Sequence, residues 1–367
     1  MTTRTVPGTS SGGTPRRGLV LGGGGMLGAA WTVGALCAVE EATGRRPGEA
    51  DVLLGTSAGA ILAAMLAGGV PAEHLRDHQR GLPITEGPLA GIAFDYDTAA
   101  GGALPPRPRA GIGSPDLLRD VVRHPREYPL LTMVSAMAPH GRGSLEPVGE
   151  LVRGLFGPGG WSAPESSAAV AGATPSAAAA PLRVAAVDYR SGRRVVFGDP
   201  EAPAVAVADA VMASCAIPGW FAPVRLDGSA YVDGGCWSAT NADLLLGRGL
   251  DEVYVLAPMA LRLGPRPERS GRGTLAAVRE WRARDRPRGV LAQLVSRYRR
   301  AVTRQLLREA ALLRAEGVRV RLLAPTLADL AVMGPNLMDP ARRGEVLESA
   351  LRTSRAALAA ERGPGPK

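Results

Sequence analysis

Cysteines and long apolar runs are scarce in this sequence, and each scarcity excludes a class of protein. The three cysteines, Cys37, Cys215 and Cys236, are too few and too widely spaced for a disulfide framework, and no two have the CxxC spacing of a zinc site. Such cysteine usage is typical of a reducing compartment and predicts a cytoplasmic protein. No uncharged apolar run reaches the roughly 18 residues of a bilayer-spanning helix, so no transmembrane segment is predicted.

Lysine is also scarce, since Lys367 is the only one, and arginine therefore supplies the formal net charge of +9. Residues 262–308 hold 14 arginines against three acidic residues, a local balance of +11. Because the only aromatic residues in this segment are Trp281 and Tyr298, we do not expect it to bind nucleic acid. A solvated helix face is the simplest interpretation, and peripheral contact with an anionic membrane is the alternative.

Composition divides the chain into a tail, a folded domain and two loose segments. Residues 1–15 are rich in Thr, Ser, Gly and Pro, which predicts a disordered tail before a single domain over 16–361. Residues 81–113 contain many Gly and Pro without periodicity and form a candidate lid. Residues 157–181 are of low complexity. We expect both segments to be flexible.

Two successive strand, turn and helix units open the domain. The apolar run 18–21 leads through four glycines into the helical pattern 26–41, and the run 51–54 leads through a short turn into the helix 60–67. Alternating strands and helices form parallel sheets with helices on their faces. The sequence therefore predicts an α/β fold with a mostly parallel central sheet flanked by helices. Further predicted elements are helices at 115–124 and 204–215, a hairpin over 182–198, and strands at 253–256 and 318–323.

Ser57 is the candidate nucleophile. It is the central residue of Gly55-Thr56-Ser57-Ala58-Gly59, a G-x-S-x-G pattern between a predicted strand and a predicted helix. In that context a sharp turn exposes the serine hydroxyl, and the small residues Gly55 and Gly59 are needed for steric reasons. The N-terminus of the following helix favours developing negative charge.

The base that accepts the serine proton is predicted to be a carboxylate. The last of the four histidines is His140, whereas the histidine of an α/β-hydrolase triad comes last in the chain, after the serine and an acid. Asp233 stands at the end of a predicted strand and is followed by Gly234 and Gly235, which allow close backbone approach. We therefore expect Asp233 to be the base.

A glycine-rich turn supplies the expected oxyanion hole. Gly22, Gly23, Gly24 and Gly25 lie between the first strand and the first helix, and Gly28 follows inside that helix. Backbone N–H groups that no side chain shields can bind an anion in such a turn. We expect the N–H groups of Gly23, Gly24 and Gly25 to bind the oxyanion, with Gly22 and Gly28 in supporting positions.

Three features of the sequence also allow other interpretations. The pattern Gly23-x-Gly25-x-x-Gly28 also fits a dinucleotide site, but the second strand ends at the serine turn where that site needs an acidic residue. The arginine-rich segment could instead be an anionic-surface binding element on an inactive hydrolase scaffold. His74 and His78 have i, i+4 spacing, yet their polar surroundings favour a solvated helix face over a metal site.

Together, the motifs resemble the patatin-like phospholipases, lipid acyl hydrolases with a Ser-Asp dyad. The blocks 22–28, 55–59 and 233–235 are similar to that family's oxyanion loop, nucleophile elbow and aspartate motif, in this order. Residues 213–223 are similar to the segment that commonly precedes the aspartate. The resemblance covers about residues 17–260 and implies a three-layer α/β/α sandwich.

The resemblance also implies a reaction. Ser57 would attack the carbonyl carbon of a lipid ester while Asp233 accepts its proton, and water would then hydrolyse the acyl-enzyme, with no metal and no organic cofactor. The chain departs from the family at Leu27, because the residue before the last loop glycine is often Arg or Lys there. Oxyanion stabilisation is therefore expected to rest on backbone donors.

Overall fold

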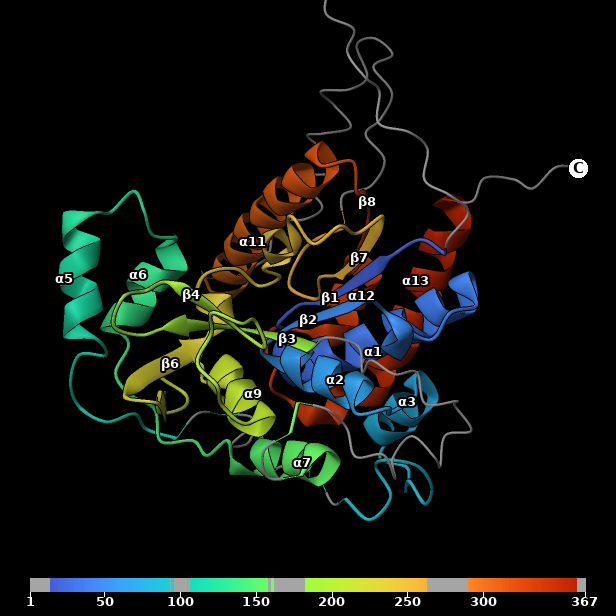
Figure 1. Ribbon diagram of the computed structural model, residues 1–367, viewed down its shortest axis with the longest axis horizontal. Coiled ribbons are helices and arrows are strands. Elements are labelled where there is room, and N and C mark those ends of the chain that lie inside the picture. The colour runs from blue at the N-terminus through green and yellow to red at the C-terminus, as the bar shows by residue number, and fades with distance from the viewer. Residues whose placement is uncertain are drawn as a thin grey trace, which may run out of the picture.

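The computed structural model describes residues 14–92, 94–95, 104, 106–157, 160–161, 182–262 and 290–361. Its centre is an eight-stranded sheet (Figure 1). The strands are β1 (Arg17–Leu21), β2 (Val52–Thr56), β3 (Leu182–Asp188), β4 (Arg194–Phe197), β5 (Val224–Leu226), β6 (Ser229–Asp233), β7 (Glu252–Leu256) and β8 (Arg319–Leu323).

Helices connect these strands and follow the last of them. The α-helices are α1 (Gly25–Thr43), α2 (Ala58–Ala67), α3 (Ala72–Gln79), α5 (Pro115–Arg123), α6 (Leu130–Met137), α7 (Glu146–Phe156), α9 (Val207–Cys215), α11 (Val290–Ala315), α12 (Leu327–Met333) and α13 (Arg343–Glu361). Short 3₁₀ helices are η1 (Pro47–Glu49), η2 (Gly234–Cys236), η3 (Ala242–Leu245) and η4 (Pro340–Arg342).

Hydrogen-bonded pairing links the strands in the series β5-β6-β3-β2-β1-β7-β8, and β4 also pairs with β3. Strands β3, β2, β1, β7 and β8 are parallel, whereas β4 and β6 pair antiparallel with β3, and β5 pairs antiparallel with β6. The predicted α/β fold with a mostly parallel central sheet is thereby confirmed.

Helices cover both faces of this sheet. Because successive side chains of a strand point to opposite faces, Leu19 and Leu21 of β1 lie in a buried cluster with residues of α1, α2 and α13. Val20 lies in a second cluster with residues of α11. The chain therefore forms three layers, with the sheet in the middle (Figure 1).

The first two predicted units are confirmed, with one shift that affects the site. Strand β2 continues to Thr56, beyond the predicted run 51–54, and α2 begins at Ala58. Ser57 is thus the single residue between strand and helix. The predicted hairpin is found as β3 and β4. Helices α6, α7, α12 and α13 were not predicted.

Several predicted segments lie outside the described residues. These are residues 1–13 of the predicted tail, most of 157–181, parts of 81–113, and residues 263–289 of the arginine-rich segment. Their predicted flexibility, and the single domain over 16–361, stay predictions. Within the described part of the chain, no helix combines the length and the apolar character needed to cross a bilayer.

Candidate active site

The sheet brings the ends of β2 and β6 together. Strand β2 pairs with β3 as far as Thr56, opposite Ala185, and β6 pairs with β3 as far as Asp233, opposite Ala186. Strand β4 pairs with both Ala185 and Ala186, so it lies along one edge of β3. Strands β2 and β6 therefore share the opposite edge of β3. They run toward each other along this edge and end at neighbouring positions. Ser57 follows Thr56, so this topology places it beside Asp233.

Ser57 and Asp233 lie next to each other at this junction, and both are buried. The side chain of Ser57 interacts with the Asp233 carboxylate and lowers its pKa. The N–H of Gly235 donates to Oδ1 of Asp233 at 2.6 Å. Only 7% of Ser57 and 5% of Asp233 is exposed. Burial raises the pKa of Asp233 to about 6, although the interactions with Ser57 and with the Gly235 N–H act in the opposite direction.

Ser57 has a backbone conformation that is rare for a residue with a side chain. Its φ is 54° and its ψ is −128°, and such conformations cost about 1–3 kcal/mol. The Ser57 N–H donates to Oγ of Ser214 at 2.9 Å, and the Ser214 hydroxyl donates to the Ala185 carbonyl at 2.6 Å. The N–H of Asp233 donates to the Ala216 carbonyl at 3.0 Å. The segment that resembles the one preceding the family aspartate therefore contacts both site residues.

The glycine-rich turn lies against Ser57. A Cβ atom placed on Gly23 would lie 3.1 Å from Cβ of Ser57. The Gly23 N–H already donates to the Ala239 carbonyl at 2.8 Å. The N–H groups of Gly24 and Gly25, at the N-terminus of α1, have no hydrogen-bond partner among the described residues. These two groups are therefore the free donors of the turn.

Close backbone approach explains the glycines around the two reactive groups. A Cβ on Gly59 would lie 2.0 Å from the Leu21 carbonyl oxygen, and a Cβ on Gly234 would lie 2.3 Å from the Ala185 carbonyl oxygen. Neither position has room for a side chain. The other supporting glycines of the three motifs lie close by in the sequence: Gly22 follows β1, Gly28 is in α1, Gly55 is in β2 and Gly235 is in η2.

Asn241 joins the serine turn to the loop after Asp233, and no sequence motif indicates this residue. It is fully buried with a φ of 52°. Its Nδ2 lies within hydrogen-bond distance of Oγ1 of Thr56 (3.2 Å) and of the carbonyl oxygens of Gly234 (3.3 Å) and Ser238 (2.7 Å). Asn241 therefore fixes the spacing between the two loops that carry the reactive groups.

Glu309 of α11 holds the loop that contains Asn241. The hydroxyls of Ser238 and Thr240 donate to its carboxylate at 2.5 and 2.6 Å, and the N–H of Ala242 donates at 2.9 Å. Burial raises the pKa of Glu309 above its ordinary value, although these hydrogen bonds act in the opposite direction. Since Ala239 accepts the Gly23 N–H, the same loop also supports the glycine turn. Glu309 lies 67 to 71 residues after these loop residues in the sequence, so no local pattern could have indicated it.

Two contacts of the glycine turn come from the C-terminal part of the chain. The N–H of Leu27 donates to the Leu337 carbonyl at 2.9 Å. A Cβ on Gly25 would lie 2.7 Å from Sδ of Met338. Leu27 itself is fully buried. An apolar residue at this position therefore packs into the interior, where an Arg or Lys of the kind common in the family would be costly.

The histidines occupy other places. His78 is half-buried against Phe94, with ring centroids 5.7 Å apart, and burial lowers its pKa to about 4. The expectation of a solvated face is therefore wrong for His78. His124 pairs with an acidic residue one turn earlier, and Nε2 of His140 lies 2.9 Å from the Gly113 carbonyl oxygen. Among the described residues, no group of three His, Cys, Asp or Glu side chains could hold a metal ion.

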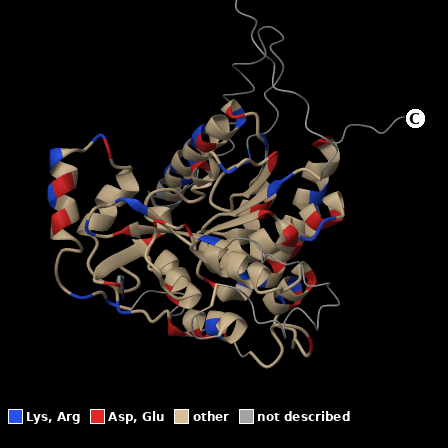
Figure 2. Cartoon of the chain, viewed as in Figure 1, with Lys and Arg blue, Asp and Glu red and all other residues tan. Residues whose placement is uncertain are grey.

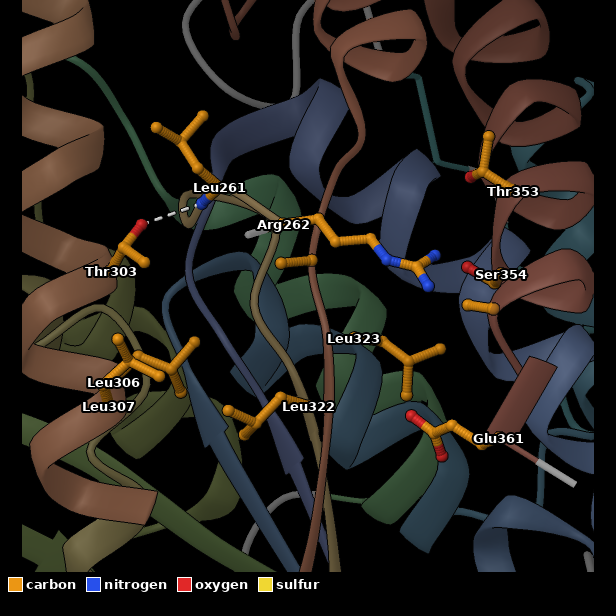
Figure 3. A pocket seen from close by; sticks show the side chains of 12 residues that line it. Leu261, Arg262, Thr303, Leu306, Leu307, Leu322, Leu323, Thr353, Ser354 and Glu361 are labelled. Carbon is orange, nitrogen blue, oxygen red and sulfur yellow. Dashed lines mark hydrogen bonds between the residues drawn. The ribbon is translucent and has the colours of Figure 1, made fainter. Parts of the chain in front are cut away.

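A pocket of about 260 Å³ lies apart from these residues, between α11, β8 and α13. Its walls are mostly leucines and alanines, and Figure 3 shows the Arg262 side chain extending toward Ser354. It includes neither Ser57 nor Asp233. We therefore assign the candidate active site to the junction of β2 and β6 and not to this pocket.

Comparison with known proteins shows the family of this chain. Residues 19–246 match the family described as patatin-like phospholipase, a span that contains all three motifs. No curated protein matches the chain. Among solved structures, VipD from Legionella pneumophila is similar at 15% identity and a TM-score of 0.44, over 95% of this chain and 67% of that chain. Because the family match covers more than half of the sequence, the chain belongs to the patatin-like phospholipase family.

Proposed function

We propose that this protein is a serine acyl hydrolase that cleaves carboxylic ester bonds of lipids, either phospholipids or related acyl esters. Membership of the patatin-like phospholipase family supports lipid acyl hydrolysis in general. The observation that carries the specific proposal is the junction of β2 and β6 on β3, which places the Ser57 side chain beside the buried Asp233 carboxylate, at a turn where Ser57 has a positive φ. This arrangement fits a nucleophile and its base.

In the proposed first step, Oγ of Ser57 attacks the ester carbonyl carbon and Asp233 accepts the hydroxyl proton. The carbonyl oxygen becomes an oxyanion, for which the N–H groups of Gly24 and Gly25 are the proposed donors. The N-termini of α1 and α2 add favourable partial positive charge. When the intermediate collapses, the leaving alcohol takes the proton from Asp233, and the acyl group stays on Ser57.

In the second step, water attacks the acyl-enzyme and Asp233 accepts a proton from it. Collapse of this intermediate releases the carboxylic acid, and the proton on Asp233 returns to Oγ of Ser57. The chain's own groups account for each proton, so the proposal includes no metal and no organic cofactor. A cytoplasmic location remains a prediction from the three cysteines, which are free and buried.

The test is a panel of p-nitrophenyl esters of increasing acyl length and of phospholipids with different head groups. We expect the wild-type protein to hydrolyse members of both sets and Ser57→Ala to hydrolyse neither. Activity that is equal in the two proteins would contradict the proposal. Binding of DNA without any ester hydrolysis would instead favour the inactive-scaffold alternative.

The pH dependence of hydrolysis should follow the ionisation of Asp233. The carboxylate accepts a proton only when ionised, so kcat/KM should fall as pH drops through the raised pKa of about 6. Well below that pKa, the loss should be about tenfold per pH unit. The measurement is the pH profile of kcat/KM on an uncharged soluble ester. A profile that is flat through this range would contradict Asp233 as the base.

Glu309→Gln should lower kcat by about tenfold or more while KM changes little, because hydrogen bonds to a charged acceptor are worth about 1.5–3 kcal/mol each. An amide cannot accept from all three donors of the 238–242 loop. The loop would shift, and with it the supports of the glycine turn and of Asn241. Gln305→Ala is the matched control, since it removes only the Nε2 donor to Glu309 at 3.1 Å. Unchanged kcat in Glu309→Gln would show that the loop does not position the reacting groups.

We also propose peripheral contact with anionic lipid through the exposed side of α11 (Figure 2). Arg297, Arg300, Arg304 and Arg308 are exposed at helical spacing, and none has an ion-pair partner among the described residues. Arg299, in contrast, is buried and donates to the Pro258 carbonyl at 2.9 Å. Only the exposed arginines are therefore available to lipid head groups.

Replacing Arg297, Arg300 and Arg304 with Gln should weaken adsorption to anionic vesicles by about tenfold or more at low salt, because each basic residue near such a surface contributes about 1 kcal/mol. The matched control replaces three exposed arginines elsewhere, at positions 193, 225 and 352. Co-sedimentation with anionic and zwitterionic vesicles over a salt series is the measurement. Equal adsorption of both variants would assign the effect to net charge alone.

A further inference from the structure

Helix α6 exposes an apolar stripe and buries its polar side chains. Leu130, Val134 and Met137 are 73%, 49% and 55% exposed, and they recur at i, i+4 and i+7 along one side of the helix. Thr132 and Ser135 of the same helix are buried. A helix that only covers a protein core has the reverse arrangement, with its apolar side inward.

Hydrogen bonds fix α6 in this orientation, next to the candidate active site. The Thr132 hydroxyl donates to the carbonyl of Cys236 at 2.7 Å, three residues after Asp233. The carbonyl of Ser135 accepts from the Tyr189 hydroxyl at 2.7 Å. Rotating the helix to bury the stripe would break both bonds. The exposure of the stripe is therefore built into the packing around Asp233.

Exposed large hydrophobic side chains are concentrated in the region around the stripe. Of the ten exposed large hydrophobic side chains in the described part of the chain, five belong to residues 112–137. Arg123, Arg126 and Glu127 are exposed at the connection between α5 and α6, and neither arginine has an ion-pair partner among the described residues. Figure 1 shows α5 and α6 together at one side of the molecule. Exposed apolar patches beside basic residues are typical of surfaces that meet membranes.

We propose that the α6 stripe, defined as Leu130, Val134 and Met137, docks on the surface of a lipid aggregate with anionic head groups. The choice of lipid as the occupant rests on the proposed function, because a lipid esterase meets its substrate at such a surface. The apolar stripe enters the acyl boundary, and Arg123 and Arg126 lie near the phosphates of the head groups. Docking there places the loop that follows Asp233 beside the interface that holds the ester.

The test measures binding without hydrolysis. All proteins carry Ser57→Ala and are sedimented with vesicles of phosphatidylcholine, alone or mixed with phosphatidylglycerol. The stripe variant replaces Leu130, Val134 and Met137 with Ser. The matched control replaces Leu82 and Leu327, which are 50% and 57% exposed and lie elsewhere in the chain, with Ser.

We expect the stripe variant to bind the mixed vesicles at least about tenfold more weakly than the control, also at high salt, since apolar burial is not screened. Binding equal to that of the control would overturn the proposal. So would a wild-type dimer that the stripe variant converts to a monomer, because a second copy of the chain would then cover the stripe. Leu130→Ser alone gives the same comparison if the triple variant does not fold.

Failure of this proposal is distinguishable from failure of the proposed function. With Ser57 intact, the stripe variant should hydrolyse a short soluble ester at the wild-type rate and lose activity only on vesicles. If no ester is hydrolysed but stripe-dependent binding persists, the proposed function fails and the docking surface stands. If the stripe variant matches the wild-type protein in its activity on vesicles and also in its activity on soluble ester, the function stands and the docking surface is rejected.

Discussion

Ser57→Ala and Asp233→Asn are each expected to lower the rate of ester hydrolysis by about 10³-fold or more, because a nucleophile and its base act as a unit. Alanine removes the attacking oxygen. Asparagine keeps the size of the aspartate side chain but cannot accept a proton at neutral pH. The measurement is kcat on a soluble ester, for both single variants and for the double variant. The double variant should be no slower than the slower single variant.

The stability of Asp233→Asn separates a catalytic from a structural role. Burial raises the pKa of Asp233 to about 6, so keeping the carboxylate ionised at neutral pH costs folding free energy. The Asn variant should therefore unfold at a temperature no lower than that of the wild type, while its activity is lost. A large fall in Tm would instead mean that Asp233 holds the loop together.

Histidine variants are the control for the identity of the base. His124→Gln and His140→Gln change side chains whose recorded partners are an acidic residue of α5 and the Gly113 carbonyl. Both variants should keep most of the wild-type activity. If either lost acylation, or if Asp233→Asn kept more than about a tenth of the activity, a histidine would have to replace Asp233 in the proposed mechanism.

Local sequence patterns were sufficient to place Ser57 and to predict the sheet. The G-x-S-x-G pattern depends on steric requirements within five residues, and the structure shows those requirements in the approach of Gly59 to the Leu21 carbonyl. Strands and helices of the first units were predicted because their apolar residues have a regular period. The bounds of β2 were less accurate, since Gly55 and Thr56 continue the strand although they add little hydrophobicity.

The supports of the site could not be predicted, because they depend on contacts between distant segments. Ser214 binds the backbone of Ser57 across 157 residues. Asn241 and Glu309 are polar residues with no local motif, and their function is visible only when strands β2 and β6 meet on β3. The orientation of α6 is likewise set by tertiary hydrogen bonds, against the usual rule that the apolar side of a helix faces inward.

Gly24→Val is expected to lower kcat by about 10²–10³-fold with little change in KM, because the loss of an oxyanion donor has effects of this size. Gly24 has a φ of 178°, which any residue can adopt, so the reason is space and not backbone strain. A Cβ there would lie 2.9 Å from Cα of Gly28 and 2.9 Å from Cγ of Pro258. The turn would have to move, and the N–H groups of Gly24 and Gly25 would move away from Ser57. Ground-state binding of the ester depends less on these donors than the transition state does, so KM should change little.

Gly344→Val makes the same chemical change where a Cβ would meet nothing within 4 Å, so it reports the general effect of valine in place of glycine. Gly24→Ala adds the Cβ alone and should give an intermediate loss. Thermal unfolding of all three variants shows whether a rate loss comes from the site or from the fold. If a variant is slower but its Tm is unchanged, the loss comes from the displaced turn at the site. If Gly24→Val folds and retains wild-type kcat, the oxyanion must be bound elsewhere. The N–H of Ala58, at the N-terminus of α2, would then be the donor to examine.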